Sequence, residues 1–298
     1  MLTIHTPAKI NRTLRVVRRR ADGYHELDSE FLAVSLRDTL VLRPSAAAAL
    51  RVDGPTAAGV PSDGSNLVQR VLADFGNRTG AAPLAVSLTK RIPNRAGLGG
   101  GSSDAAAALW GANELAGRPL GAGDLHAIAA AHGSDLNVFL AVLMQPCQRV
   151  RATGRGEIVR PLPDEAWHGV IAQPPWGLST GAIFTAWGRT QRPTDAATGD
   201  AATGNAATGD AANDLQAAAE SVSPDLQRWR LAIEAATGCR WTMSGSGSAY
   251  WTSVGDAAQA ATVAARLTES QSDAAVFPVQ AAGAEVVWPD DREIDELF

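Results

Sequence analysis

Apolar positions recur at two different spacings along this chain, and each spacing predicts one type of element. In L-A-V-S-L-T-K-R-I, the apolar Leu84, Val86 and Leu88 alternate with smaller or polar residues, as in a half-buried strand. Residues 65–75 instead repeat apolar positions with the helical period behind a serine, which predicts a helix capped by that serine. An Ala-rich run ending at Leu115 has strong helix propensity. The chain therefore mixes strands and helices.

The remaining patterns extend this mixture along the chain. In the N-terminal part they predict a strand, a turn and a second strand over 2–20, one or two strands over 31–44 and a loop over 45–62. Two helices over 120–140 and a hairpin over 149–160 follow. The C-terminal part contains a strand around Val170 and Ile171, helices up to residue 236, a strand, turn and strand over 239–254, a helix over 256–270 and a strand around Val276. These elements indicate an α+β fold. At 298 residues the chain is long for one core, so we expect two domains, the first ending with the hairpin at residue 160.

The connection between the strand near 84–92 and the Ala-rich helix is rich in glycine. Residues 93–109 are P-N-R-A-G-L-G-G-G-S-S-D-A-A-A-A-L. The glycines allow positive φ angles and let backbone N–H groups converge. Ser102 and Ser103 stand at N-cap positions and Asp104 falls in the first helical turn, where negative charge is favoured. The segment therefore predicts a phosphate site at a helix N-terminus, whose serine hydroxyls contact phosphate or help to hold Mg²⁺.

Two common phosphate motifs are excluded by single residues. The dinucleotide motif G-x-G-x-x-G fails because Ser102 occupies the place of its third glycine, and the motif G-x-x-x-x-G-K-[ST] fails because no lysine follows the glycines. A loop that only turns the chain is the alternative. The coincidence of glycines, paired serines and a helix start favours phosphate binding.

Composition narrows the class of protein. The net charge of −5 argues against a nucleic-acid partner, and the absence of an apolar run of 18 residues or an apolar N-terminal segment argues against a membrane partner. Cys147 and Cys239 form no C-x-x-C pair, which excludes a disulfide scaffold and suits a reducing cytosol. We therefore expect a cytoplasmic protein. Three copies of A-A-T-G-[DN] over 196–210 predict a mobile low-complexity loop, at about 193–212, to which no function is assigned.

Lysine is rare in this chain. Of 26 basic residues only Lys9 and Lys90 are lysines, and the bias draws attention to Lys9, whereas Lys90 is interpreted as a chance survival. Lys9 and Asn11 are two residues apart, so in a strand they lie on one face, where a cation and an amide suit a phosphate or a substrate hydroxyl. A solvated strand face is the alternative.

Three further sites carry side chains of chemical interest. Tyr24 and His25 follow an Asp-Gly turn and could stack on a base and bind its edge, or could be a half-buried ring beside a surface imidazole. Asp135 opens the second helix of 120–140, as an ordinary cap or as a carboxylate beside a γ-phosphate, paired with Lys9. The run S-G-S-G-S at 244–248 could be a simple hairpin.

These motifs together resemble a known superfamily. P-x-x-x-G-L-G-G-G-S-S-D-A-A resembles the ATP-binding motif of the GHMP kinases. P-A-K-I-N at 7–11 and R-A-D-G-Y-H-E-L at 20–27 are similar to the members that phosphorylate the 2-hydroxyl of 4-diphosphocytidyl-methylerythritol in non-mevalonate isoprenoid synthesis. The resemblance implies a two-domain α+β fold: an N-terminal ATP-binding domain (1–160), a C-terminal ferredoxin-like domain (161–298) and an active site between them. It also implies ATP, Mg²⁺, a small-molecule substrate, and a monomer or weak homodimer.

The resemblance also assigns roles to residues. Lys9 and Asp135 are implied as the catalytic pair. Nucleotide contacts are implied for Asn66, Pro93, Asn94, Arg95, Ala96, Gly97, Leu98, Gly99, Gly100, Gly101, Ser102 and Ser103, with Ser103 also a candidate Mg²⁺ ligand. Substrate contacts are implied for Asn11, Tyr24, His25, Thr180, Phe184, Ser244, Gly245, Ser246 and Gly247. Phe184 and Tyr24 would sandwich the cytosine, and the 244–248 segment would close over the phosphates.

The sequence departs from the family pattern beside Asp135. The family has G-A-D-V-P-F-F-L, whereas here Ser134 replaces Ala, Asn137 replaces Pro and Val138 replaces Phe, so we expect altered packing there. These changes keep an inactive nucleotide-binding homologue open as an alternative. A GHMP kinase of the homoserine or mevalonate type is a second alternative, although it gives no reason for Tyr24 and His25 beside the Asp-Gly turn.

Overall fold

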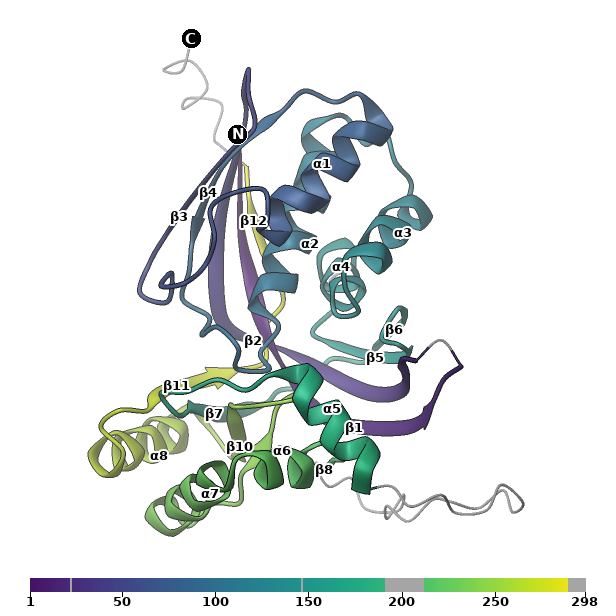
Figure 1. Ribbon diagram of the computed structural model, residues 1–298. Helices are drawn as coiled ribbons and strands as arrows, with labels where there is room; N and C mark the ends of the chain where they lie inside the picture. Colours follow the sequence, from purple (N-terminus) through teal and green to yellow (C-terminus); the bar gives the residue numbers. More distant parts are fainter. Residues whose placement is uncertain (22, 146, 191–211, 289–298) are drawn as a thin grey trace.

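The computed structural model describes residues 1–21, 23–145, 147–190 and 212–288. The predicted low-complexity loop lies almost wholly outside these residues. Two sheets, each covered by helices, lie one above the other in Figure 1. In the described part of the chain no helix is long and apolar enough to cross a membrane.

The first sheet contains most of the strands of the N-terminal half. Its members are β1 (Leu2–Arg19), β2 (His25–Pro44), β3 (Ala49–Asp53), β4 (Leu84–Thr89), β5 (Arg149–Gly154), β6 (Ile158–Leu162), β8 (Ala212–Asn213) and β12 (Glu285–Val287). The order is β12-β1-β2-β4-β3, with β5 joining β2 to β6 and β8 paired to β1. β6 continues past residue 160, and β8 and β12 return to this sheet from the C-terminal half.

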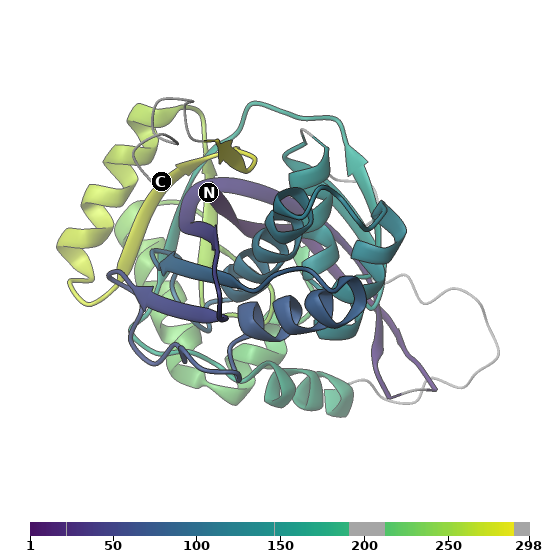
Figure 2. The same ribbon diagram turned by 90° about the horizontal axis from the view of Figure 1, so that it is seen from above.

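Four helices gather on one side of the first sheet (Figures 1 and 2): α1 (Leu67–Thr79), α2 (Gly100–Leu115), α3 (Ala122–His132) and α4 (Leu136–Met144). The Ala-rich α2 is the central one. Its alanines 105–108 are fully buried, and a Cβ added at Gly111 would lie 3.0 Å from the Ile4 Cδ1 atom on β1. Small side chains therefore let α2 pack directly on the sheet, and the glycine-containing residues 93–99, called the glycine segment below, lie directly before its N-terminus.

The second sheet has the order β11-β7-β10-β9 and is antiparallel throughout. Its strands are β7 (His168–Gln173), β9 (Thr242–Met243), β10 (Tyr250–Val254) and β11 (Ala275–Gln280), and its helices are α5 (Thr180–Thr190), α6 (Gln216–Val222), α7 (Pro224–Thr237) and α8 (Ala257–Ser270). Helical segments follow the first and third of these strands, and their spatial order is 4-1-3-2. This is the βαββαβ topology of a ferredoxin-like fold, so the predicted α+β fold is confirmed.

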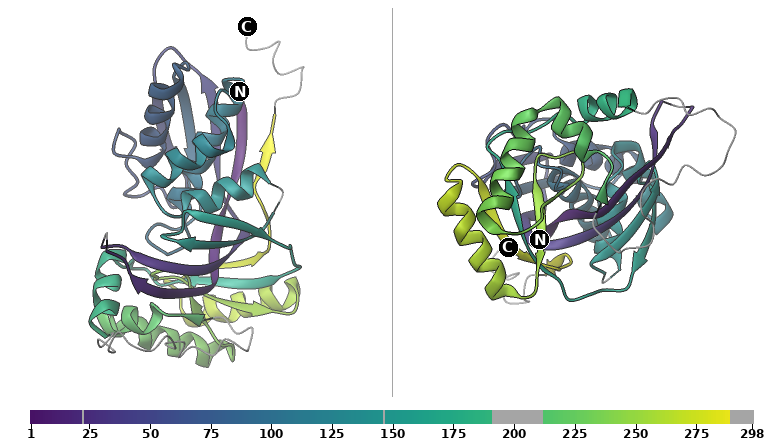
Figure 3. Two further views of the ribbon diagram at one scale, coloured as in Figure 1. Left: turned by 90° about the vertical axis from the view of Figure 1, so that its right-hand side faces the viewer. Right: turned by 90° about the horizontal axis from the view of Figure 1, so that it is seen from below.

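The long strands β1 and β2 differ from the expected strand, turn and strand over 2–20. β1 is one strand of 18 residues whose pairing with β2 shifts register at three points, between Pro7 and Ala8, Asn11 and Thr13, and Val16 and Arg18. Such shifts interrupt the alternation of apolar residues without ending the strand, which explains the wrong turn prediction. The pair extends from the first sheet down to the second (Figure 3, left).

Three local expectations were also wrong. β3 forms inside the expected loop 45–62, because it pairs in parallel with β4 despite its low strand propensity. The cap of α1 is Asn66, whose Oδ1 accepts the N–H of Val68 at 2.9 Å, and not the preceding serine. α2 begins at Gly100 with Gly99 as its N-cap, so residues 102–104 lie inside the helix, where they cap nothing.

Candidate active site

Lys9 lies in β1 with its side chain almost fully buried. Its ammonium donates to the Oδ1 atom of Asn11 at 2.6 Å, as the alternation of a strand predicts for two residues on one face. The Asn11 amide in turn donates to the Ser29 hydroxyl at 2.7 Å. The backbone N–H of Lys9 donates to the carbonyl of Leu98 at 3.0 Å, so the strand is joined directly to the glycine segment.

Asp135 reaches the same point from another element. It is the N-cap residue of α4 but makes no capping bond with its side chain; instead its Oδ2 lies 3.7 Å from the Lys9 Nζ. About a third of the Asp135 side chain is exposed (34%), whereas Lys9 is 4% exposed. Burial lowers the pKa of Lys9, and the Asp135 carboxylate opposes that effect. The pair therefore combines an accessible carboxylate with a buried amine.

The glycine segment turns sharply before α2. Gly97 and Gly99 have φ angles of 75° and 73°, which favour glycine. α2 then starts without a side-chain cap, so its first N–H groups point out of the helix without the partner that a capping side chain would supply. A helix start without a side-chain cap, preceded by a glycine turn, can bind an anion, because its N–H groups point outward and it carries the positive end of the helix dipole.

The 244–247 loop of the second sheet packs against the glycine segment. The Ser244 hydroxyl donates to the Gly97 carbonyl at 3.0 Å. A Cβ added at Gly97 would lie only 2.1 Å from the Ser244 carbonyl oxygen, and one at Gly245 would lie 3.2 Å from the Lys9 Nζ. The Ser246 hydroxyl lies 2.8 Å from that of Thr180 at the start of α5. Glycine at 97 and 245 thus permits the two loops to meet over Lys9.

A cleft of about 1430 Å³ opens where these elements meet. Of the predicted residues, it is lined by Lys9, Asn11, Tyr24, His25, Arg95, Gly97, Gly99, Asp135, Thr180, Phe184, Gly245, Ser246 and Gly247. The other predicted site residues do not line the cleft: Asn66, Pro93, Asn94, Ala96, Leu98, Gly100, Gly101, Ser102, Ser103 and Ser244. Among the described residues, seven Lys and Arg side chains and two carboxylates border the cleft, which therefore favours an anionic ligand.

Aromatic rings gather at the end of the cleft near the β1–β2 turn. The His25 ring stacks on Phe184 at a centroid distance of 5.0 Å and meets Trp187 edge-on at 5.4 Å. The guanidinium of Arg155 lies 4.9 Å from the centroid of the half-exposed Tyr24 ring. Burial and the nearby Arg19 lower the pKa of His25, which favours the neutral imidazole. A base that stacks on the His25-facing side of Phe184 requires His25 to move.

This chain is similar to known proteins both in sequence and in fold. Residues 66–143 match the GHMP kinases N terminal domain. The chain is 38% identical to a 4-diphosphocytidyl-2-C-methyl-D-erythritol kinase from Nocardia farcinica, over 82% of each chain, and 37% identical to one from Paramagnetospirillum magneticum, over 93% of this chain and 98% of that one. A crystal structure of 4-(cytidine 5'-diphospho)-2C-methyl-D-erythritol kinase superposes with a TM-score of 0.73 at 32% identity, covering 94% of this chain and all of that one.

This chain belongs to the 4-diphosphocytidyl-2-C-methyl-D-erythritol kinase family. It is an ATP-dependent small-molecule kinase of the GHMP superfamily. The homoserine kinase of Cytophaga hutchinsonii, at 18% identity and a TM-score of 0.67, covers 96% of this chain and 97% of its own and shares the fold.

In this member of the kinase family, three predicted nucleotide residues have structural partners for their side chains: Ser103, Asn66 and Asn94, whose amide donates to the Thr56 carbonyl at 2.7 Å. The Ser103 hydroxyl is fully buried and donates to the Pro7 carbonyl at 2.7 Å, beside the Thr6 hydroxyl. The Asn66 side chain caps α1 and donates to the Pro61 carbonyl at 2.6 Å. The geometry therefore does not support Ser103 as a Mg²⁺ ligand, because its oxygen points into the packing between α2 and β1.

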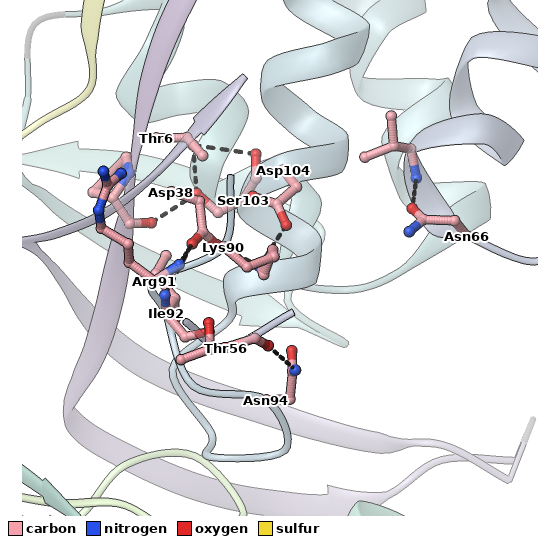
Figure 4. A network of polar contacts seen from close by, with 12 residues as sticks. Thr6, Asp38, Thr56, Asn66, Lys90, Arg91, Ile92, Asn94, Ser103 and Asp104 are labelled. Atoms are coloured by element: carbon pink, nitrogen blue, oxygen red, sulfur yellow. Dashed lines mark hydrogen bonds and ion pairs between the residues drawn. The ribbon is translucent and has the colours of Figure 1, made fainter. Parts of the chain in front are cut away.

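A buried charged network behind the glycine segment was missed by sequence reasoning (Figure 4). Lys90 is 1% exposed and donates to the carboxylates of Asp38 and, at 2.6 Å, Asp104. Asp38 also accepts the backbone N–H groups of Arg91 and Ile92. Burial raises the pKa of Asp104 to about 8. Lys90 is therefore no chance survival: it joins β2, β4 and the second turn of α2. The rarity of lysine was the available signal.

The residues that replace the family motif after Asp135 are well packed in this kinase. Asn137 is 1% exposed; its Oδ1 lies 2.9 Å from the His126 Nδ1, and its amide donates to the Glu157 carbonyl at 3.3 Å. Val138 packs among apolar side chains that include Phe31 and Val150. The substitutions thus leave Asp135 on a supported helix start.

Proposed function

We propose that this protein transfers the γ-phosphoryl group of ATP to the 2-hydroxyl of 4-diphosphocytidyl-2-C-methyl-D-erythritol. The observation that carries the proposal is the Lys9–Asp135 pair, which borders the same cleft as the glycine segment and the aromatic rings. One cleft thus joins the side chains for three tasks: holding phosphates, acting on a hydroxyl and stacking on a base. The relatives described above are named for this substrate.

Asp135 is the residue that acts on the hydroxyl in this proposal. Its carboxylate accepts the proton of the 2-hydroxyl while the hydroxyl oxygen attacks phosphorus in line with the departing ADP oxygen. Lys9, held by Asn11 and 3.7 Å from Asp135, stabilises the negative charge that develops on the transferred group. Most of the rate enhancement then comes from positioning two anionic substrates between fixed charges.

The nucleotide phosphates are assigned to the start of α2. The glycines at 97 and 99 turn the backbone toward the anion, and the uncapped N–H groups of the helix bind it. The 244–247 loop covers this end of the cleft and limits access of water. Tyr24, His25, Phe184 and Thr180 are assigned to the cytidyl end of the substrate.

A magnesium ion is part of the proposal. The described residues contain no cluster of three or more His, Cys, Asp or Glu side chains able to hold a metal alone. Mg²⁺ bound mainly by nucleotide phosphates needs only one or two protein carboxylates. Asp135 fits that need, because its carboxylate borders the cleft, is partly exposed and caps no N–H group. When bound, the ion neutralises charge on the phosphates.

We also infer a cytoplasmic protein that is a monomer or a weak homodimer. Both cysteines are free thiols, which suits a reducing compartment. Sedimentation at several protein concentrations distinguishes a monomer from a weak dimer, and a stable higher oligomer would contradict the proposal.

The test of the proposed reaction is ADP release with Mg-ATP and three acceptors in parallel. The cytidyl substrate is compared with homoserine and mevalonate, and the Asp135→Asn variant reports the background. We expect turnover with the cytidyl substrate alone, inhibited competitively by cytidine diphosphate. Turnover with another acceptor instead would overturn the proposed substrate, and ATP binding without any turnover would indicate an inactive homologue.

A further inference from the structure

Arg155 connects the two ends of the cleft and has no role in the function proposed above. It lies in the turn between β5 and β6, borders the cleft and is about one third exposed (33%). Its guanidinium lies on the Tyr24 ring, at 4.9 Å from the centroid. The pairing of Leu27 with Gly154 brings this turn beside the start of β2, where the aromatic rings lie.

The next residues of the same turn contact the segment that carries Asp135. A Cβ added at Gly156 would lie 3.1 Å from the Ser134 Cβ and 3.3 Å from the Ser134 carbonyl oxygen. The turn thus contacts the aromatic end through Arg155 and, through Gly156, it contacts Ser134, the residue that precedes Asp135. Arg155 therefore lies between the proposed positions of the base and of the reacting hydroxyl.

The position of Arg155 is fixed by its surroundings. Glycines with positive φ flank it, with 73° at Gly154 and 111° at Gly156. The Glu157 carboxylate accepts the backbone N–H of Arg155 and lies 3.8 Å from the guanidinium Nε. The Glu157 carbonyl accepts the Asn137 amide, which ties the turn to α4. The turn is thereby braced against the helix that begins at Asp135.

A guanidinium in this place suits a phosphate. It has five N–H donors in one plane, so a single long contact through Nε leaves donors for a ligand. The contact with the Tyr24 ring holds the guanidinium at this end of the cleft, and a planar fork binds two phosphate oxygens at once. The cytidyl substrate of the proposed reaction carries its diphosphate between the base and the methylerythritol.

We propose that Arg155 is a specificity-determining residue that binds the diphosphate of the cytidyl substrate and holds it between the Tyr24 end and the Lys9–Asp135 end of the cleft. This inference rests on the proposed function. It assigns recognition of the substrate diphosphate to Arg155, which belongs neither to the glycine segment nor to the Lys9–Asp135 pair.

The test compares Arg155→Gln with Arg155→Lys in steady-state kinetics and in binding of cytidine, CMP and CDP. We expect Arg155→Gln to raise the KM of the cytidyl substrate by roughly tenfold to a hundredfold, while the KM of ATP changes by less than about twofold. Arg155→Lys should fall between, because it keeps the charge but loses the planar fork. The preference of the wild-type protein for CDP over cytidine should largely disappear in Arg155→Gln.

Arg160→Gln is the matched control, because Arg160 is an exposed arginine of the same hairpin, outside the cleft lining. It removes the same charge and should leave every constant within about twofold. An unchanged KM and an unchanged CDP preference in Arg155→Gln would overturn the inference. Failure of the wild-type protein to phosphorylate the cytidyl substrate would instead overturn the proposed function, and the nucleotide binding series would still test Arg155.

Discussion

The Lys9 ammonium lies 3.7 Å from the Asp135 carboxylate, although the two residues come from the first strand and from the start of the fourth helix. If this carboxylate accepts the proton of the substrate, Asp135→Asn should lower kcat by about 10² or more. The dissociation constant of ATP measured without Mg²⁺ should change little, because the phosphates are assigned to α2, whereas Asp135 is proposed to contact the nucleotide only through the metal ion. Steady-state kinetics together with calorimetric titration of ATP measure the two effects.

The control for this variant is Asp124→Asn. Asp124 is also an acid at a helix start, in the first turn of α3, and it is exposed outside the cleft lining. It should leave kcat unchanged. A normal kcat in Asp135→Asn would remove the residue from the mechanism.

The two lysines should titrate at opposite sides of the ordinary lysine value. Burial lowers the pKa of Lys9, whereas at Lys90 the carboxylates of Asp104 and Asp38 outweigh burial and raise the pKa. Because the chain has only these two lysines, NMR of protein labelled with ¹³C-lysine should give two side-chain signals with well separated titrations.

The Asp135→Asn variant tests whether Asp135 affects the pKa of Lys9. Loss of the carboxylate removes an attraction for the Lys9 proton, so the lower pKa should fall further while the higher one stays in place. Lys9→Arg assigns the signals. A lower pKa that is indifferent to Asp135→Asn would contradict the pairing of the two residues.

Gly97→Ala should destabilise the protein. The added Cβ would meet the Ser244 carbonyl at 2.1 Å, and the φ angle of 75° is unfavourable for alanine. We expect a loss of about 1–3 kcal/mol in the free energy of unfolding, measured by urea denaturation without nucleotide. Gly101→Ala is the control: it is helical, its Cβ would meet nothing within 4 Å, and alanine there should stabilise by about 0.5–1 kcal/mol. If the two substitutions change the free energy of unfolding equally, the glycine segment and the 244–247 loop can move apart at no energetic cost, which would contradict the prediction.

The buried carboxylate of Asp104 should make stability depend on pH. Burial raises its pKa from 3.8 to about 8, so the folded protein keeps a proton that the unfolded chain has lost between about pH 4 and pH 8. The contribution of this group to the free energy of unfolding therefore decreases as pH rises through that window. Asp104→Asn holds no such proton, so its unfolding free energy should fall less steeply than that of the wild-type protein.

Denaturation curves at pH 5 and pH 8 measure the difference between the two slopes. Asp38→Asn is the comparison within the same network. It weakens the contacts of Asp38 with Lys90 and with two backbone N–H groups, so it should destabilise the protein at both pH values. Identical slopes in the wild-type protein and Asp104→Asn would show that Asp104 is ionised in the folded state.

Local patterns predicted the parts of the fold in which neighbouring residues determine the geometry. The alternation around Lys9 and Asn11 correctly placed both side chains together, and the glycines correctly marked a turn before a helix. The continuity of β1 could not be predicted, because its register shifts depend on pairing with β2. β3 depends in the same way on β4.

The contacts that complete the candidate site join residues far apart in the sequence. Nothing near Lys90 indicates that Asp38 reaches it from another strand. The contact of Arg155 with Tyr24 likewise follows from the pairing of β2 with β5. For Lys90 the rarity of lysine was a signal in the sequence, whereas the hairpin predicted over 149–160 gave no indication that Arg155 meets Tyr24.

The burial of both lysines gives this protein an unusual chemical surface. The chain has two lysines in all, and their side chains are 4% and 1% exposed. Amine-directed dyes, crosslinkers and acylating agents therefore find no lysine on the outside of the folded molecule. Slow acylation of a lysine in the native protein would instead record the opening of the cleft at Lys9, and bound substrates would delay it.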